Sequence, residues 1–168
     1  RAACGAVLQD GFIFSDTIAN NIAESSPAVD PERLLKAVEL VNLKPFIDGL
    51  PLRYNTKIGA MGNGISQGQR QRLLVARAIY KTPDFLFFDE ATNALDANNE
   101  REIVHNLDRF FEGRTVVVVA HRLSTVSQAD QIVVLDQGKI AERGTHEALV
   151  ARKGVYYQLV KNQLELGQ

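Results

Sequence analysis

The sequence has few of the residues that would mark a disulfide-bonded, zinc-binding or membrane-spanning protein. Its 168 residues include one cysteine, Cys4, so an internal disulfide is excluded and a reducing compartment is favoured. We interpret Cys4 as a small buried residue rather than as a reactive thiol. The three histidines are scattered and do not form a metal-binding cluster with it. No apolar run approaches the roughly 20 residues that span a bilayer.

The chain also lacks an excess of charge of either sign. Its 19 basic and 20 acidic residues give a net charge of −1. A surface that coats nucleic acid needs a basic excess, so we expect no nucleic-acid partner. Hydrophobic residues make up 45% and charged residues 23% of the chain, which is ordinary for one folded globular domain of this length.

Two adjacent acids at the end of an apolar run are the most informative feature that is present. Phe85–Phe88 is followed directly by Asp89 and Glu90. The run predicts a buried parallel strand, and open α/β sheets bind ligands at the carboxyl ends of their strands. One carboxylate there could hold Mg²⁺ while its neighbour accepts a proton from an attacking water. The plainer alternative is a helix-capping acid with a solvated neighbour.

The phosphate-binding loop that should accompany such an acid pair is missing from the sequence. That loop needs two spaced glycines followed by lysine and then serine or threonine. The nearest match, Gly138–Lys139, has Val133 in place of the first glycine and Ile140 after the lysine. The sequence also begins at Arg1, and its only methionine is Met61. We therefore expect the C-terminal part of a longer protein whose upstream part carries the loop.

Polar residues follow two other apolar runs. Gln9 follows Ala6–Leu8, and its amide oxygen could bind Mg²⁺ or water. His121 follows Thr115–Ala120, and it could bond a phosphate oxygen or orient a water. Each has a structural alternative, since strand-end polar residues are common.

A helix start at Ser66 offers a possible anion site. Ser66 can cap the helix, and Gln69 can reach back to form a capping box. The free first-turn amides and the helix dipole favour an anion, and Gly68 would let the backbone approach it closely. An ordinary helix cap is the alternative, and for this motif alone it is the more frequent one.

The remaining patterns predict a helical first half and a second half in which strands and helices alternate. We expect helices over 16–23 (capped by Ser15), from Asp30 to about Leu43, around Phe46–Leu50, from Ser66 to Lys81, between Asp96 and Gly113, after Thr145, and over 155–160. We expect strands over 6–8, 85–88 and 115–120, and a hairpin of 132–135 with 140–141. Residues 51–64 read as an exposed loop. The fold class is α/β, with a boundary near Pro83.

In their order along the chain, these polar residues resemble the motifs of the ATP-binding cassette ATPase family. Gln9 is similar to the Q-loop, and Ile65–Gln69 to the signature motif, usually Leu-Ser-Gly-Gly-Gln. Phe85–Glu90 is similar to the Walker B strand, Ala94–Asp96 to the D-loop, and His121 to the switch histidine. The resemblance covers nearly the whole chain.

The resemblance implies a partial P-loop NTPase (RecA-like) core with a mostly parallel sheet, joined to the family's α-helical subdomain. Residues 1–16 would be the end of a core strand and the Q-loop. Residues 17–82 would be the helical subdomain with the signature motif. Residues 83–168 would be the C-terminal part of the core, with Walker B, the D-loop, the switch histidine and the last helices.

The resemblance also implies roles for individual residues, with ATP and Mg²⁺ as cofactors. Asp89 and Gln9 would hold Mg²⁺, Glu90 would be the base toward the attacking water, and His121 would contact the γ-phosphate. Four further residues would act at the ATP held by a second copy in a head-to-tail dimer: Ser66, Gly68, Gln69 and Asp96.

Finer features are typical of the exporter branch of the family. The stretch before the signature motif resembles the loop that faces the coupling helices of the membrane domain. The matching residues are Leu50–Pro51, Tyr54, Thr56–Gly59 and Gly62, although Ala60–Met61 replaces the usual Glu-Arg. The glutamine at position 67 of the signature motif is typical of peptide or bacteriocin exporters that have a fused peptidase.

The implied function is an ATPase that energises export at the cytoplasmic face of the cell membrane. Its partners would be the transmembrane domain and a second nucleotide-binding domain. Two alternatives stay open: a soluble cassette ATPase of DNA repair, chromosome handling or translation, and a non-catalytic interaction module. Because the phosphate loop is missing, we expect these 168 residues alone to have negligible ATPase activity and weak nucleotide binding.

Overall fold

The computed structural model describes residues 3–8, 11–24, 26–59, 64–89, 105–119 and 126–166, with side chains of the last helix described to residue 163. The chain divides into two compact units, Arg1–Val119 and Ala120–Gln168, which are treated separately below. Of the predicted site residues, Gln9, Glu90, Asp96 and His121 lie outside the described residues. The predicted domain boundaries near residues 16 and 82 stay predictions.

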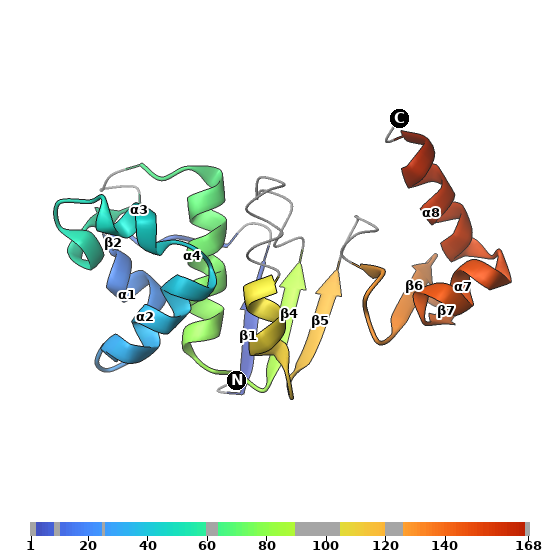
Figure 1. Ribbon diagram of the computed structural model, residues 1–168, viewed down its shortest axis with the longest axis horizontal. Coiled ribbons are helices and arrows are strands. Elements are labelled where there is room, and N and C mark those ends of the chain that lie inside the picture. Colours follow the sequence, from blue (N-terminus) through green and yellow to red (C-terminus); the bar gives the residue numbers. More distant parts are fainter. Residues whose placement is uncertain are drawn as a thin grey trace. The chain divides into compact units, whose positions relative to one another are not determined.

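A three-stranded parallel sheet forms one part of the first unit (Figure 1). Its strands lie in the order β1 (Cys4–Val7), β4 (Phe85–Asp89) and β5 (Thr115–Val119). Both pairings are parallel, with Val7 opposite Phe88 and Asp89 opposite Val119. The prediction of an α/β fold with a parallel sheet is therefore confirmed, and the carboxyl ends of the three strands lie together at one edge.

Side chains of β4 point alternately to a buried and an exposed face. Leu86 and Phe88 are 0% and 6% exposed, whereas Phe85 and Phe87 are 45% and 44% exposed. Successive strand residues point to opposite faces, and the helix over residues 105–111 packs on the buried face, where the Phe88 and Phe111 ring centroids lie 5.7 Å apart. The predicted parallel strand is therefore confirmed, but only one of its two faces is buried.

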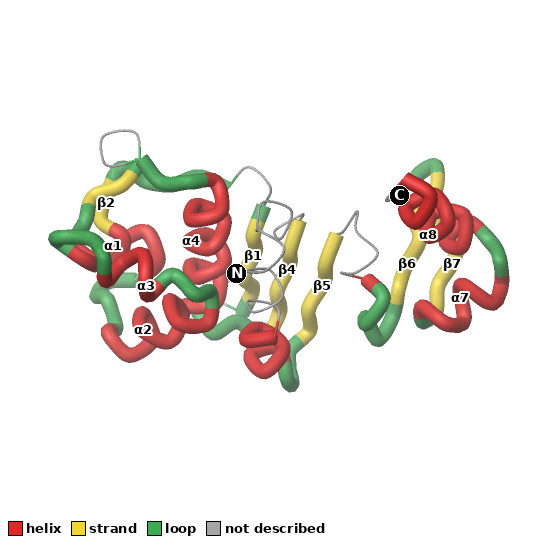
Figure 2. The backbone as a smooth tube through the Cα atoms, turned by 45° about the horizontal axis from the view of Figure 1, so that its top comes forward, coloured by secondary structure: helices red, strands yellow, loops and turns green. Residues whose placement is uncertain are grey.

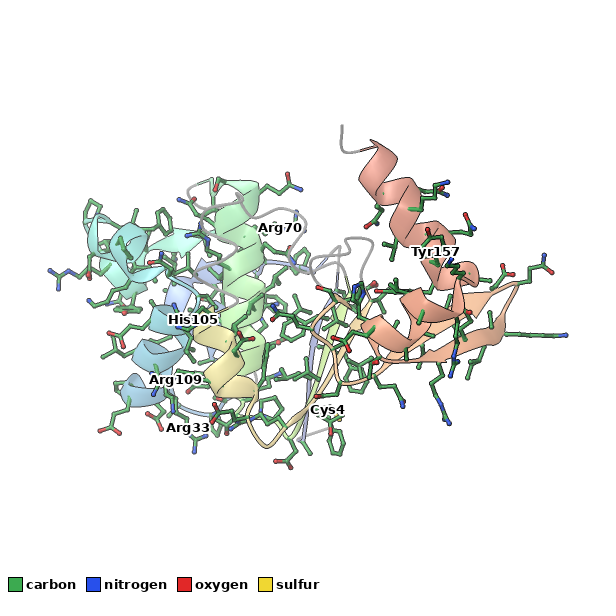
Figure 3. All side chains as sticks on the ribbon, turned by 45° about the vertical axis from the view of Figure 1, so that its right-hand side comes forward. Cys4, Arg33, Arg70, His105, Arg109 and Tyr157 are labelled. Carbon is green, nitrogen blue, oxygen red and sulfur yellow. The ribbon has the colours of Figure 1, made fainter. Side chains whose placement is uncertain are left out.

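The same alternation explains the position of Cys4. In β1, Gly5 and Val7 are buried and the Cys4 side chain is exposed. Figure 3 labels Cys4 at the end of the sheet opposite to the carboxyl ends of the strands. The interpretation of Cys4 as a buried residue is wrong, because the strand turns Gly5 and Val7, and not Cys4, toward the core.

Helices cluster beside the sheet in the first unit (Figures 1 and 2). They are α1 (Ile18–Ile22), α2 (Pro31–Leu40), α3 (Lys44–Asp48) and α4 (Gln67–Tyr80). α4 contacts α1, α2 and β1. The predicted start of α2 is confirmed, since the Asp30 carboxylate accepts hydrogen bonds from the amides of Glu32 and Arg33. The predicted apolar face is buried as expected: Leu34, Val38 and Val41 are at most 6% exposed.

The first helix begins later than the sequence predicts. Asp16 and Thr17 form a short strand, β2, which pairs antiparallel with β3 (Lys57–Ile58). The helix cap is Thr17, whose side chain accepts a hydrogen bond from the amide of Asn20, rather than Ser15. Pairing with a strand about 40 residues away competes with helix formation at Asp16, and a local pattern does not reveal that competitor.

The predicted exposed loop over 51–64 is partly structured and partly buried. It contains a 3₁₀ turn, η1 (Arg53–Asn55), and then β3. Thr56 and Ile58 are 4% and 1% exposed, so the expectation is wrong there. Gly59 has a φ of +95°, and a Cβ at this position would lie 2.8 Å from the carbonyl oxygen of Phe14. The glycine is therefore needed for the close approach of the two segments.

The second unit is a hairpin followed by two helices. β6 (Ile132–Asp136) and β7 (Lys139–Gly144) pair antiparallel, as predicted. α7 (His146–Arg152) is capped by Thr145, as predicted, and α8 (Val155–Leu166) follows. Leu149, Tyr156 and Val160 join two hairpin side chains in a small core. His146 Nδ1 lies 2.8 Å from the Tyr156 hydroxyl and links the two helices.

None of the described helices has both the length and the hydropathy of a membrane-spanning segment.

Thr82 allows a test of backbone strain at the junction between α4 and β4. It has a φ of +45°, a left-handed conformation that a β-branched residue rarely adopts. We expect Thr82→Gly to raise the free energy of unfolding by about 1 kcal/mol, measured by urea denaturation. The matched control is Lys81→Gly, since Lys81 has a φ of −73° and gains nothing from glycine. A loss of stability in both variants would contradict the prediction.

Candidate nucleotide site

Asp89 ends the middle strand of the parallel sheet. It is the last residue of β4, it is half-buried, and it lies opposite Val119 of β5. Glu90 follows it directly, Gln9 comes two residues after Val7, and His121 comes two residues after Val119. The three described strands end at one sheet edge, while Gln9, Glu90 and His121 themselves lie outside the described residues. A shared cleft for Gln9, Glu90 and His121 stays a prediction.

The N-terminus of α4 carries the predicted capping box. Ser66 Oγ accepts a hydrogen bond from the amide of Gln69 at 3.2 Å, and Gln69 Oε1 accepts one from the amide of Ser66 at 2.9 Å. The box holds the backbone of Ser66 extended (φ −66°, ψ 161°) immediately before the helix. The predicted helix start is therefore confirmed.

The same geometry leaves donors available to an anion. Ser66 is exposed, and its hydroxyl accepts from Gln69, so its own hydrogen stays free to donate. The amides of Gln67 and Gly68 belong to the first helical turn, which has no intrahelical acceptors for them. α4 has 14 residues, so a full helix dipole points at this end. The arrangement suits an oxyanion such as a phosphate.

Gln69 makes the capping contact that the sequence predicts. Its side-chain oxygen is engaged with the Ser66 amide, so Gln69 first supports the cap. The nitrogen of the same side chain retains donors for a ligand. The role of Gln69 at a nucleotide stays a prediction, as do the roles of Ser66 and Gly68.

Two partly buried arginine side chains connect α4 to other segments of the first unit. Arg72 Nη1 donates to the carbonyl oxygen of Asn42 at 3.2 Å, after the end of α2. Arg77 Nε donates to the carbonyl oxygen of Asn21 at 2.7 Å. Burial lowers the pKa of the Arg77 guanidinium, and the nearby Glu24 carboxylate opposes that shift. Arg77 keeps its charge, since an arginine pKa stays far above neutral pH.

Sequence analysis missed Arg77 and the fully buried Asn21, which organise the neighbourhood of the site. Asn20 and Asn21 both lie among the apolar residues of 18–23, so the sequence does not show which of the two is buried. For Arg77 the signal was an arginine among apolar residues of a helix. Neither signal identifies the partner, because the partners lie more than 50 residues apart.

Asp89 is the predicted metal ligand that lies within the described residues. Within that part, the structure shows no group of three or more histidine, cysteine, aspartate or glutamate side chains that could hold a metal ion. Asp89 at the sheet edge supplies one carboxylate of the hard-oxygen type that Mg²⁺ prefers. The residue fits such an ion, while the predicted second ligand, Gln9, lies outside the described residues.

A separate hollow lies in the helical part of the first unit. Its volume is about 520 Å³, and its lining includes Asn20, Leu34, Leu35 and Tyr54. Burial raises the pKa of the Tyr54 hydroxyl. The lining includes neither Ser66 nor Asp89, so we do not assign this hollow to the nucleotide site.

The parallel sheet with an acid at its carboxyl edge and the adjoining helices define an α/β protein of the P-loop NTPase fold. The chain belongs to the ABC transporter family, whose family model matches residues 1–93.

Similar proteins include a lipid A-core flippase and an exotoxin translocation ATP-binding protein. The chain is 44% identical over 165 residues to the ATP-dependent lipid A-core flippase of Syntrophus aciditrophicus (strain SB), covering 98% of this chain and 28% of that protein. It is 45% identical over 166 residues to the exotoxin translocation ATP-binding protein PaxB of Pasteurella aerogenes, covering 98% of this chain and 23% of that protein.

A solved structure shares the fold closely. It is that of a bacterial Atm1-family ABC exporter with ATP bound, with a TM-score of 0.91 and 40% sequence identity. The match covers 97% of this chain and 28% of the exporter chain. The chain thus spans about a quarter of the length of the curated relatives that it matches.

Substitutions of Ser66 test how much the capping box contributes to stability. Ser66→Ala removes the side-chain acceptor of the cap, and we expect a loss of about 1 kcal/mol in the free energy of unfolding. Ser66→Asp keeps an acceptor and suits the helix dipole, so we expect stability close to that of the wild type. Urea denaturation of the three proteins measures both effects. Equal stability of the alanine variant and the wild type would mean that the capping box contributes nothing.

Proposed function

We propose that the chain is part of a nucleotide-binding domain that hydrolyses ATP to energise export across a membrane. The observation that carries the proposal is the exposed Ser66 cap at the N-terminus of α4, in a chain whose relatives include a flippase and a toxin translocation protein. A helix N-terminus with a free hydroxyl donor binds phosphate groups favourably.

The sheet edge would supply the hydrolytic chemistry. Asp89 and Gln9 are the proposed holders of Mg²⁺, an ion that would neutralise charge on the phosphate oxygens when bound. Glu90 is the proposed base that accepts a proton from the attacking water, an effect typically worth about 10²–10⁴ in rate. His121 is the proposed donor to the γ-phosphate, which it would hold in position.

Ser66 and its neighbours would act on a different nucleotide from the one that Asp89 serves. We propose a head-to-tail dimer in which the α4 N-terminus of one copy faces ATP bound to the other. Ser66, Gly68 and Gln69 would contact that phosphate, and Asp96 would lie near the interface. The free donors of the capping box support this role, since the cap satisfies the helix while leaving its hydroxyl hydrogen available.

An exposed aromatic pair suits the proposed transmembrane partner. Phe12 and Phe14 are 66% and 41% exposed, and their rings meet edge to face with centroids 5.3 Å apart. Exposed aromatic rings of this size mark surfaces that contact another protein. We propose that this pair meets the membrane domain at the cytoplasmic face of the membrane. A peptidase domain upstream stays a prediction from the signature motif.

The soluble alternative is less well supported. The named relatives act in lipid flipping and exotoxin translocation, rather than in DNA repair, chromosome handling or translation. The interaction-module alternative would require a degenerate site, whereas the acid pair Asp89–Glu90 and His121 are present in the sequence.

Glu90→Gln tests the catalytic part of the proposal in the intact transporter. The amide cannot accept the proton of the attacking water, so we expect ATP hydrolysis to fall at least about 100-fold while ATP binding is retained. Phosphate release and nucleotide binding measure the two properties. Asp84→Asn is the matched control, because it removes an exposed carboxylate just before the opposite end of β4. Near-normal hydrolysis by Glu90→Gln would remove Glu90 from its proposed role.

The 168 residues alone should bind ATP weakly and hydrolyse it negligibly. The physical reason is that the sequence contains no lysine-bearing phosphate loop to grip the β- and γ-phosphates. Isothermal titration calorimetry with ATP and Mg²⁺ checks the expectation. A micromolar dissociation constant would contradict it.

A further inference from the structure

We infer that Arg77 is a positioning residue that joins the Gly11–Phe14 segment to α4, so that this segment and the Ser66 cap move as one body. The inference rests on the proposed function, in which the segment carries the aromatic pair that meets a partner and the cap meets a nucleotide. The segment begins two residues after Gln9, the proposed Mg²⁺ ligand.

Arg77 holds the segment directly. Its side chain is 12% exposed, and its Nη1 donates to the carbonyl oxygen of Phe12 at 2.8 Å. Its guanidinium carbon lies 5.1 Å from the centre of the Phe14 ring, in a cation–π contact. One side chain of α4 therefore contacts both aromatic residues of the segment.

Arg77 also holds the segment through Asn21. Its Nη2 donates to Asn21 Oδ1 at 3.1 Å. The same amide oxygen accepts from the backbone N–H of Phe14 at 2.8 Å, and Asn21 Nδ2 donates to the carbonyl oxygen of Phe14 at 3.0 Å. Arg77 thereby helps to set which atom of the Asn21 amide faces the segment, together with the carbonyl oxygen of Thr17, which accepts from Asn21 Nδ2 at 3.0 Å. Asn21 satisfies both backbone groups of Phe14.

A second arginine fixes the other end of the segment. Arg70 Nη2 donates to the carbonyl oxygen of Gly11 at 2.7 Å. Figure 3 labels Arg70 near the N-terminal end of α4. Between the two arginines, Leu74 lies against Gly11 so closely that a Cβ there would be 2.5 Å from Leu74 Cδ1. Arg70, Leu74 and Arg77 have the spacing of one helix face, so the segment runs along that face.

A displacement of the Gly11–Phe14 segment would therefore also displace the Ser66 cap, because α4 connects the two as a rigid helix. Arg70 is one turn from Ser66, and Arg77 is about 16 Å along the helix axis from it. A helix packed on α1, α2 and β1 shifts as a unit rather than bending. Arg77 is separate from the proposed phosphate contacts, so its effect on a nucleotide passes through α4.

The geometry requires arginine rather than any cation. Three nitrogens of Arg77 donate to two different residues in a planar fork. A lysine keeps the charge beside Glu24 but offers one nitrogen, which reaches only part of this set. Arg77→Lys thus breaks the connection between α4 and the Gly11–Phe14 segment, while it preserves the charge and much of the buried side-chain volume.

The first experiment measures hydrogen exchange in the intact transporter without nucleotide. We expect Arg77→Lys to speed exchange of the Phe14 amide about tenfold, because Asn21 loses its fixed orientation. Exchange within α4 should stay unchanged. The matched control is Arg72→Lys on the same helix, which loses a bond to Asn42 instead and should leave Phe14 at the wild-type rate. Equal Phe14 exchange in Arg77→Lys and the wild type overturns the inference.

The second experiment adds ATP, Mg²⁺ and vanadate to the same proteins. In the wild type and in Arg72→Lys we expect exchange to change in residues 11–14 and 66–70 together. In Arg77→Lys the change in 66–70 should persist, while the change in 11–14 should fall at least about fivefold. A purely structural role would raise exchange in both conditions without removing this difference, and that result overturns the inference.

Two further outcomes are distinguishable. If hydrogen exchange of residues 66–70 in the wild type does not respond to nucleotide, the proposed function fails. The nucleotide-free measurement of Phe14 exchange still decides whether Arg77 connects the segment to α4. If Arg77→Lys does not fold, Arg70→Lys replaces it, since Arg70 is exposed and its side chain donates to the carbonyl oxygen of Gly11. The Gly11 amide, which donates to the carbonyl oxygen of Leu8 at 3.2 Å, should then exchange faster because the segment is released from α4, with exchange in α4 unchanged. Wild-type exchange at Gly11 would overturn the connection between the segment and α4.

Discussion

The parallel pairing of β4 with both of its neighbours is the constraint on which the candidate site depends. The hydrogen-bond ladders place Asp89 beside Val119 at the edge where three strands end. Burial of Leu86 and Phe88 holds this register, because a slip of one residue would exchange the buried and exposed sets of side chains. The packing that stabilises the sheet therefore also positions the acid.

α4 is buried along its middle and exposed at its N-terminus. Its middle is buried, with Leu73, Ala76 and Ile79 at most 2% exposed, while its N-terminus stays at the surface. The capping box satisfies the exposed helix end without using the serine hydrogen. At the other end, the Tyr80 hydroxyl accepts a hydrogen bond from the amide of Asp30 at 2.8 Å and ties α4 to the start of α2. The helix is thus fixed along its length and open only at its N-terminus.

Local sequence signals predicted the elements that depend on neighbours along the chain. The Asp30 and Thr145 caps, the Ser66 box, the β6–β7 hairpin and the β4 strand all follow from short patterns, and the structure confirms them. Two of the failures share one cause. The pairing of β2 with β3 and the burial of Thr56 depend on segments distant in sequence, so residue type alone does not predict them.

The sequence by itself determined the family, because the order of Gln9, Ser66–Gln69, Asp89–Glu90 and His121 is a linear property of the chain. It also determined which functional groups are available for catalysis and binding, since residue type sets the carboxylate, hydroxyl and imidazole groups. Only the tertiary structure decided that Arg70 and Arg77 hold the segment after Gln9, and that Asn21 orders its backbone. The physical reason is that every residue has a backbone carbonyl that can accept a hydrogen bond. The residue type of the acceptor therefore does not reveal which distant side chain donates to it.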